Sequence, residues 1–305
     1  MDKPVINQRF DWKDLSDIAS YQKWRSSKLK DAENLQESAP IDVKNMSDLT
    51  DSERDELMLR CRKVNFACYR VEESETDSDG VNIALRKFSA AFGMRVAEDH
   101  RSAGQAGIVN LRESKSEGQR GYVPYTAKSM NWHTDGYYNA PEDYVSGFVL
   151  HCVRPAQSGG SNEILDPEIA YIRLRDENPD FISALVHPQA MSIPENREAS
   201  GKVRPVSVGP VFYADPETGR LQMRYTARTR SIYWREDPLT NEAQSFLGEI
   251  LGGPDPLSQR VTLGAGEGIL NNNVLHNRTA FSDPTDQSPG RLICRVRFSN
   301  RVEGS

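Results

Sequence analysis

The last part of the chain alternates apolar and polar residues with a period of two. The run "GRLICRVRFSN" at 290–300 puts Leu292, Cys294, Val296 and Phe298 on one face of a strand, and Arg291, Ile293, Arg295 and Arg297 on the other. Such a strand must bury its apolar face against another layer. The chain therefore needs a sheet that is covered on at least one side.

Further β-prone runs lie at 64–71, 143–153 and 266–281, and 209–226 is typical of a hairpin with its turn at 215–219. Helices are predicted within 47–64, capped by Asp48 or Thr50, at 81–92 before Gly93, and at 241–251. Asp166-Pro167 and Asn178-Pro179 each open another helix. Strands on both sides of central helices predict a β-sandwich or barrel with helices outside.

The bulk properties predict a soluble globular protein. Of 305 residues, 37% are apolar and 27% are charged, and the net charge of −6 does not suit a nucleic-acid partner. We expect no membrane span, no signal peptide, four unpaired cysteines and a cytoplasmic location. Residues 1–60 are charged and loosely periodic, and we expect a helical or extended segment before one domain at 61–305.

The stretch "NWHTDGYY" at 131–138 contains a possible metal site. In a strand, His133 and Asp135 would point to the same side, which presents an imidazole beside a carboxylate. A third ligand must come from elsewhere. His276, in the polar segment "NNNVLHNRTAF", is the best candidate.

The other three histidines favour ordinary structural roles. We expect His100 in a polar loop, His151 as a hydrogen-bonded strand residue, and His187 at a helix end. Two histidines and one carboxylate are the ligand set of non-haem Fe(II) oxygenases, and the same set also serves zinc hydrolases.

The arginine face of the terminal strand favours iron. 2-Oxoglutarate chelates such an iron, and its far carboxylate needs a fixed cation, for which arginine offers two parallel donors. Arg291 would hold that carboxylate, and Arg295 would support it or bind an anionic substrate. The alternative is a surface strand whose polar face meets water.

Taken together, "NWHTD", "GFVLHCV" leading into "SGGSNEILD", "ADPETGRLQMRY", "VLHNRTAF" and "RLICR" resemble the taurine dioxygenase group. This group of Fe(II)/2-oxoglutarate-dependent oxygenases includes phenoxyacetate dioxygenases and clavaminate synthase. The resemblance covers residues 60–300 in order and implies a double-stranded β-helix core, a jelly roll of the cupin type, mainly β with flanking helices.

The resemblance also implies roles for single residues. His133, Asp135 and His276 match the iron ligands, Arg291 matches the 2-oxoglutarate arginine, and Arg295 matches a substrate arginine. At about the place of Asn162, the family often has a threonine that touches the co-substrate. Relatives are commonly dimers or tetramers, so a homo-oligomer is expected.

The predicted function is Fe(II)- and 2-oxoglutarate-dependent hydroxylation of a small anionic molecule, releasing succinate and CO2. Cleavage follows where the hydroxylated carbon bears a sulfonate or ether. Candidate substrate contacts are Ser129, Gly136, Tyr137, Arg228 and Arg230, with Tyr138 beside them. The alternatives are a small-molecule sensor on the same fold and a zinc hydrolase using the same three ligands.

Overall fold

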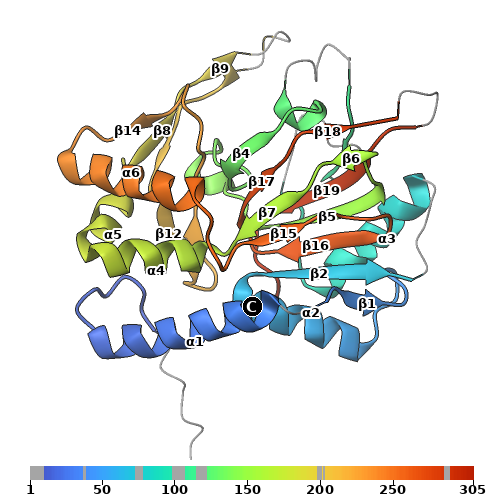
Figure 1. Ribbon diagram of the computed structural model, residues 1–305, viewed down its shortest axis with the longest axis horizontal. Coiled ribbons are helices and arrows are strands. Elements are labelled where there is room, and N and C mark those ends of the chain that lie inside the picture. The colour runs from blue at the N-terminus through green and yellow to red at the C-terminus, as the bar shows by residue number, and fades with distance from the viewer. Residues whose placement is uncertain are drawn as a thin grey trace, which may run out of the picture.

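The computed structural model describes residues 10–36, 39–72, 78–97, 107–114, 122–197, 201, 203–284 and 289–305. His100 and the polar loop predicted around it lie outside these ranges. Two sheets form the centre of the molecule, and the larger one has six strands (Figure 1). In spatial order these are β1 (Ile41–Val43), β2 (Phe66–Val71), β16 (Glu267–Asn271), β5 (Gly147–Arg154), β19 (Leu292–Phe298) and β3 (Ile108–Leu111).

The second sheet has four antiparallel strands. In spatial order these are β15 (Gln259–Val261), β7 (Asn162–Leu165), β17 (Leu275–Arg278) and β4 (Met130–His133). The two sheets meet face to face, since the ring of Phe148 on β5 lies 4.9 Å from that of His276 on β17. A short pair, β6 (Ser158–Gly159) with β18 (Phe281–Ser282), lies beside them.

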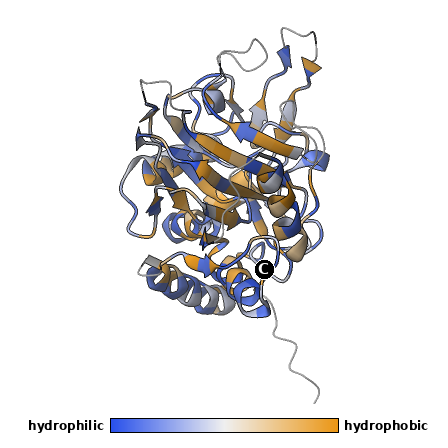
Figure 2. Cartoon of the chain, turned by 90° about the vertical axis from the view of Figure 1, so that its right-hand side faces the viewer, coloured by the Kyte–Doolittle hydropathy of each residue, from blue (hydrophilic) through white to orange (hydrophobic). Residues whose placement is uncertain are grey.

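Helices cover the outer faces of both sheets (Figure 1). Buried side chains of α2 (Asp51–Val64) and α3 (Ser78–Ala91) pack on the large sheet. On the side of the four-stranded sheet lie α4 (Pro167–Glu177), α5 (Pro179–Leu185) and α6 (Pro238–Gly252), and α1 (Ile18–Gln36) contacts both groups. The strands at the centre are mostly apolar, and the surrounding loops are largely hydrophilic (Figure 2).

Short strands at one end complete the fold. They are β8 (Met191–Ile193) with β11 (Ser207–Gly209) and β14 (Tyr233–Trp234), β9 (Asn196–Arg197) with β10 (Val203–Arg204), and β12 (Phe212–Ala214) with β13 (Leu221–Met223). The last pair is the predicted hairpin. Its turn is held by Asp215 Oδ1, which accepts from the backbone N–H groups of Glu217 and Thr218.

Local signals located most elements, with shifts at the ends. Thr50 caps α2 in a reciprocal capping box with Glu53, and Gly93 follows α3 with φ +62°. The helix predicted from 241 begins earlier, at Pro238, because the side chain of Asp237 caps it. Strand β5 begins at Gly147, since residues 141–143 form a 3₁₀ turn instead.

Both faces of β19 are buried, so the surface-strand alternative was wrong. Cys294, Val296 and Phe298 lie against α2 and α3, whereas Arg291 and Arg295 point to the interior and are 6% and 5% exposed. The predicted division of the chain at residue 60 stays a prediction. Helix α2 spans that residue, and β1, which precedes it, pairs in parallel with β2, which follows it.

Candidate metal and co-substrate site

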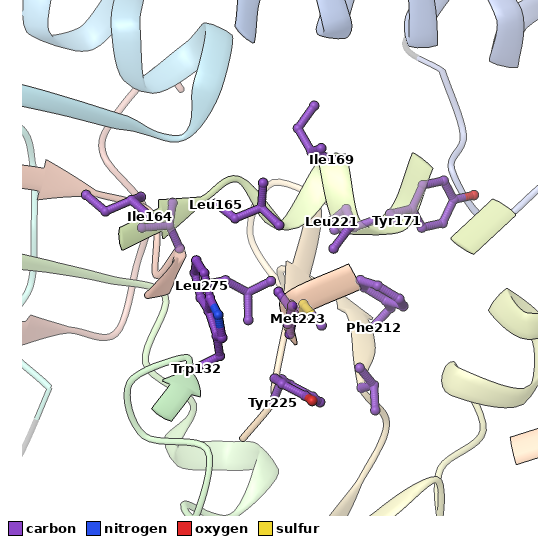
Figure 3. Close-up of a cluster of buried hydrophobic side chains, with 14 of the residues drawn as sticks. Trp132, Ile164, Leu165, Ile169, Tyr171, Phe212, Leu221, Met223, Tyr225 and Leu275 are labelled. Carbon is purple, nitrogen blue, oxygen red and sulfur yellow. The ribbon is translucent and has the colours of Figure 1, made fainter. Parts of the chain in front are cut away.

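His133 and His276 stand directly opposite each other on neighbouring strands. The pairing of β17 with β4 places the two residues across from one another, so both side chains point to the same face. Their sequence neighbours Trp132 and Leu275 point to the other face. Figure 3 shows these two beside Met223 in the apolar cluster on that side. Strand alternation thus holds the imidazoles on the inner face.

Backbone carbonyl groups orient both imidazole rings. The Nδ1–H of His133 donates to the carbonyl oxygen of Asn131 (2.8 Å), and that of His276 donates to Val274 (3.0 Å). A carbonyl oxygen can only accept, so the proton stays on Nδ1 and the Nε2 lone pair is free. Burial lowers the pKa of His133 to about 3, and both rings are neutral near pH 7.

Asp135 follows β4 and is held through its backbone. Its N–H donates to the side-chain oxygen of Asn273 (2.7 Å), and Asn273 Nδ2 donates back to its carbonyl oxygen (3.0 Å). Gly136 then turns the chain at φ +68°, where a Cβ would lie 2.5 Å from Val145. Any larger residue would be strained there, so the turn itself requires a glycine at position 136.

Two arginines of β19 hold the carboxylate of Asp135. Arg297 Nε donates to Oδ2 at 2.8 Å, and Arg295 Nη1 lies 3.3 Å from the same oxygen. Burial alone would raise the pKa of Asp135, but the two guanidinium groups hold it well below its usual range. The carboxylate is therefore ionised, with Oδ1 facing His133 Nε2 at 3.8 Å.

The three residues fit a divalent metal. One ligand atom of each lies within 4.8 Å of the others, and all three residues are buried. A point within about 2.8 Å of all three atoms therefore exists, compared with metal–ligand bonds of roughly 2.0–2.2 Å. Two neutral imidazoles and one carboxylate on one side leave the remaining positions for other ligands.

A second cationic region surrounds Phe281. The guanidinium carbons of Arg291 and Arg278 each lie 5.0 Å from its ring centroid. Arg278 donates to backbone carbonyl oxygens of Thr126 and Lys128, whereas within the described ranges the guanidinium of Arg291 has no hydrogen bond or ion pair. Burial lowers the pKa of both, that of Arg278 to about 10. The region suits an incoming carboxylate.

The structure also places Asn162 and Arg295 toward the interior. Ile164 pairs with His276 across β7 and β17, and Asn162, two residues earlier, shares that face. Asn162 is 5% exposed. Arg295 keeps a buried Nε without a hydrogen-bond partner in the described part of the chain, and Tyr125 Oη is in the same condition. These donors remain open to a ligand.

The residues predicted to contact the substrate lie in different parts of the structure. The ring of Tyr137 stands edge-on to His133 at 6.3 Å, and Arg228 Nη1 donates to its hydroxyl (3.2 Å). Arg230 is exposed, and within the described ranges no contact ties it to these residues. Ser129 lines a cavity of about 340 Å³ on the outer face of the four-stranded sheet, whose lining contains none of the three proposed metal ligands.

The two other histidines in the described ranges have structural contacts, as expected. His151 is 3% exposed on the outer face of β5, and its Nδ1 lies 3.3 Å from Tyr69 Oη. His187 lies in a turn after α5, where its Nδ1 accepts from the N–H of Gln189. Neither belongs to the metal cluster.

Sequence reasoning did not single out Arg297, Arg278 or Arg204. Five asparagines lie close in sequence to the proposed ligands and are chemically able to support them, and the sequence alone does not distinguish among them: Asn131, Asn271, Asn272, Asn273 and Asn277. Asn273 adopts φ +55° and binds Asp135, whereas the side chain of Asn271 donates to Phe148 O. The other asparagines bind elsewhere or contribute only a carbonyl group: Asn272 contacts Ser305, Asn277 contacts Glu163, and Asn131 holds His133. Alternation on β19 was the one signal that pointed to Arg297.

Comparison with curated proteins finds two uridine-5′-phosphate dioxygenases. The protein from Amycolatopsis sp is 27% identical over 184 residues, and the one from Streptomyces sp is 29% identical over 187 residues. The matches cover 59% and 58% of this chain. In each case they span 64% of the relative's own length, which is less than two thirds.

Among solved structures, the non-haem iron oxygenase OrfP in complex with Fe, succinate and (3R,4R)-dihydroxy-L-Arg has the same fold. Its TM-score is 0.62 at 16% identity, over 89% of this chain and 84% of that one. This likeness confirms the predicted jelly-roll core with flanking helices. The family model for taurine catabolism dioxygenase TauD, TfdA family matches residues 74–297. The resemblance seen in the motifs is confirmed, and the chain belongs to this family.

Proposed function

We propose that this chain is an Fe(II)- and 2-oxoglutarate-dependent dioxygenase that hydroxylates a small anionic molecule and releases succinate and CO2. The observation that carries the proposal is the buried cluster of His133, Asp135 and His276, whose ligand atoms lie within 4.8 Å of one another. Family membership and the names of the relatives support the same reaction.

In this proposal the three side chains hold ferrous iron, which supplies the activation of O2. The two imidazoles present Nε2, since their Nδ1–H groups are held by backbone carbonyls. Asp135 presents Oδ1, since Arg297 holds Oδ2 at 2.8 Å, whereas Arg295 Nη1 lies near both oxygens and makes only a long hydrogen bond of 3.5 Å to Oδ1. The chain thus fixes three donors before any metal binds, which reduces the cost of ordering them.

We assign Arg291 to the far carboxylate of 2-oxoglutarate. Its buried guanidinium makes no direct ion pair in the described ranges, where Asp283 acts on it only at longer range, and a charge-assisted hydrogen bond to a carboxylate would satisfy it. Asn162, on the face of His276, is proposed as a second contact to the co-substrate.

The substrate is proposed to be an anion that lies near Arg295, the family's substrate position. Its open Nε and the hydroxyl of Tyr125 are buried donors able to bind a polar group of the substrate. Bond cleavage would follow only where hydroxylation leaves an unstable carbon. A cytoplasmic location and a homo-oligomeric state are proposed with it. No helix among the described residues is long and apolar enough to cross a lipid bilayer.

The proposal is tested by succinate formation with Fe(II), 2-oxoglutarate and O2 across a panel of amino acids, sulfonates and nucleotides. Anaerobic Fe(II) with 2-oxoglutarate should also give a metal-to-ligand charge-transfer band. Absence of both the band and succinate would overturn the proposal. Turnover without O2 in zinc-containing protein would favour the hydrolase instead.

Two variants separate the roles within the site. Asp135→Ala should abolish turnover and weaken iron binding, because one of three ligands is lost. Arg291→Ala should raise the 2-oxoglutarate concentration needed for half-saturation at least about tenfold while iron binding persists. Arg173→Ala, whose guanidinium pairs with Asp255 on the outside of the fold, is the control. Normal 2-oxoglutarate binding in Arg291→Ala would show that the anchor is elsewhere.

A further inference from the structure

A pair of arginines lies beside the metal cluster on the side of Tyr137 and Tyr138. Arg228 follows residues 225–227, which run along β4 through the bridge of Thr226 with His133. Its Nη1 donates to Tyr137 Oη at 3.2 Å. Arg204, at the end of β10, donates from Nη1 to the carbonyl oxygen of Tyr138 at 3.1 Å and lies 5.5 Å from that ring.

Neither arginine of this pair has a carboxylate partner in the ranges that the structure describes. Arg204 is half-buried, and its guanidinium is fixed by carbonyl oxygens, which leave its charge in place. Burial lowers the pKa of Arg204, and repulsion from Arg228 lowers it further. The side chain of Arg228 is exposed, and the rings of Tyr137 and Tyr138, which the two arginines contact, lie 5.1 Å apart. An anion that reaches both guanidinium groups would therefore meet two positive charges.

Other arginines of the same region differ in this respect. Arg197, on the strand paired with β10, binds Glu195 at 3.1 Å, and Arg235 binds Asp237 at 3.5 Å. Arg230 also lacks a carboxylate partner in the described ranges, so what distinguishes Arg204 and Arg228 is that each is bonded to one of the two tyrosines that follow Asp135. Arg228 is linked to the proposed metal cluster through Tyr137, whose ring stands 6.3 Å from that of His133.

We propose that Arg204 and Arg228 form the subsite for the phosphoryl group of a phosphomonoester substrate. Two guanidinium groups match a dianion better than a sulfonate or carboxylate, and a phosphomonoester carries about −1.5 to −2 at pH 7. The curated relatives are named for uridine-5′-phosphate, which belongs to this class. The inference rests on the proposed function and names the substrate class of that site.

The test measures anaerobic binding of uridine 5′-phosphate, uridine and inorganic phosphate to the full chain loaded with Fe(II) and 2-oxoglutarate. We expect the phosphate ester to bind more tightly than uridine and inorganic phosphate to compete with it. Arg204→Gln and Arg228→Gln should each weaken binding of the ester at least about tenfold and leave uridine unchanged. Arg197→Gln is the matched control, because its charge is already paired.

A pH series adds an independent readout. The second pKa of a phosphomonoester is near 6, so affinity should fall below about pH 6 as the dianion is lost. Equal binding of ester and nucleoside, or unchanged ester binding when Arg204→Gln and Arg228→Gln are combined in one protein, would overturn the subsite. The charge-transfer band separates the two proposals: a band without phosphate binding rejects the subsite alone, whereas absence of the band rejects the dioxygenase itself.

Discussion

The carboxylate of Asp135 has two different oxygen environments. Oδ2 accepts from Arg297 Nε at 2.8 Å, and Arg297 is itself held by the hydroxyl of Tyr138 at 2.8 Å. Oδ1 faces His133. Partners of this kind decide which oxygen of a carboxylate is offered to a metal and how firmly it is aimed. Arg297 is therefore a positioning residue in the proposed site.

Replacing Arg297 with Gln should weaken binding of Fe(II), or of Co(II) as a stable substitute, by about 10- to 100-fold. The reason is that Oδ2 loses its strongest donor and the carboxylate can rotate away from the two histidines. Metal affinity is measured by calorimetry on the protein without co-substrate, which keeps the readout separate from turnover.

Tyr138→Phe tests the same arrangement with a smaller change. It removes only the hydroxyl that holds Arg297, so the loss of metal affinity should have the same sign and be smaller. A circular dichroism spectrum should show that both variants are folded. Metal affinity equal to that of the unaltered protein in Arg297→Gln would mean that Arg295 alone aims the carboxylate.

Among single residues, the sequence identified those side chains whose direction follows from the period of two along a strand. His133 and Asp135 stand two apart, and strand periodicity alone predicts that they share a face. Asn273 could not be chosen among its neighbours, because its role depends on a left-handed backbone at φ +55° that local sequence does not reveal. Arg204 could not be found at all, since it belongs to a hairpin and stands 69 residues after Asp135.

Among the elements, α1 is attached to the body of the protein by a buried cation. Lys28 is 4% exposed, and its Nζ lies 2.6 Å from Asp166 and 2.5 Å from Glu168 at the start of α4. It also donates to the carbonyl oxygen of Lys63. Two carboxylates that are buried this deeply require the ammonium group between them.

Lys28→Met should lower the free energy of unfolding by about 3–5 kcal/mol, because it leaves two buried carboxylates without their cation. Urea denaturation at neutral pH measures the loss. Lys30→Met, two residues further along α1 on the exposed side, is the control and should change little. If Lys28→Met lost no more than the control, the ion pairs would contribute nothing to the docking of α1.

Helix α1 also shows why the N-terminal part was hard to predict. Its inner face is made of Tyr21, Trp24 and Lys28, which follow helical spacing, but the lysine interrupts the apolar pattern. By contrast, the first residues of α4 and of α5 were both predicted correctly. Asp166-Pro167 and Asn178-Pro179 are local capping signals that need no tertiary partner.

For the whole molecule, the architecture was predictable and the strand partners were not. Alternation indicated strands that need a covering layer, and motif order indicated the jelly roll. The pairing of β17 with both β4 and β7 joins segments more than 100 residues apart, and no local pattern specifies it. The proposed metal cluster depends on that pairing, because it brings His276 opposite His133.

The burial of neutral His151 beneath α3 makes global stability depend on pH. Burial lowers its pKa to about 4 in the folded protein, compared with 6.5 for the free side chain. Between these values only the unfolded chain takes up the proton. The stabilisation is therefore complete above about pH 6.5 and is lost as the pH falls toward 4.

From pH 7 to pH 5 this residue alone should remove about 2 kcal/mol from the free energy of unfolding. His151→Gln keeps a polar partner for Tyr69 Oη and cannot titrate, so its urea-unfolding profile should be flatter than that of the unaltered protein by this amount. Other titrating groups contribute equally to both proteins and cancel in the difference. Parallel profiles would show that His151 is as easily protonated in the folded protein as in the unfolded chain, and that the layer between α3 and the large sheet admits a charge.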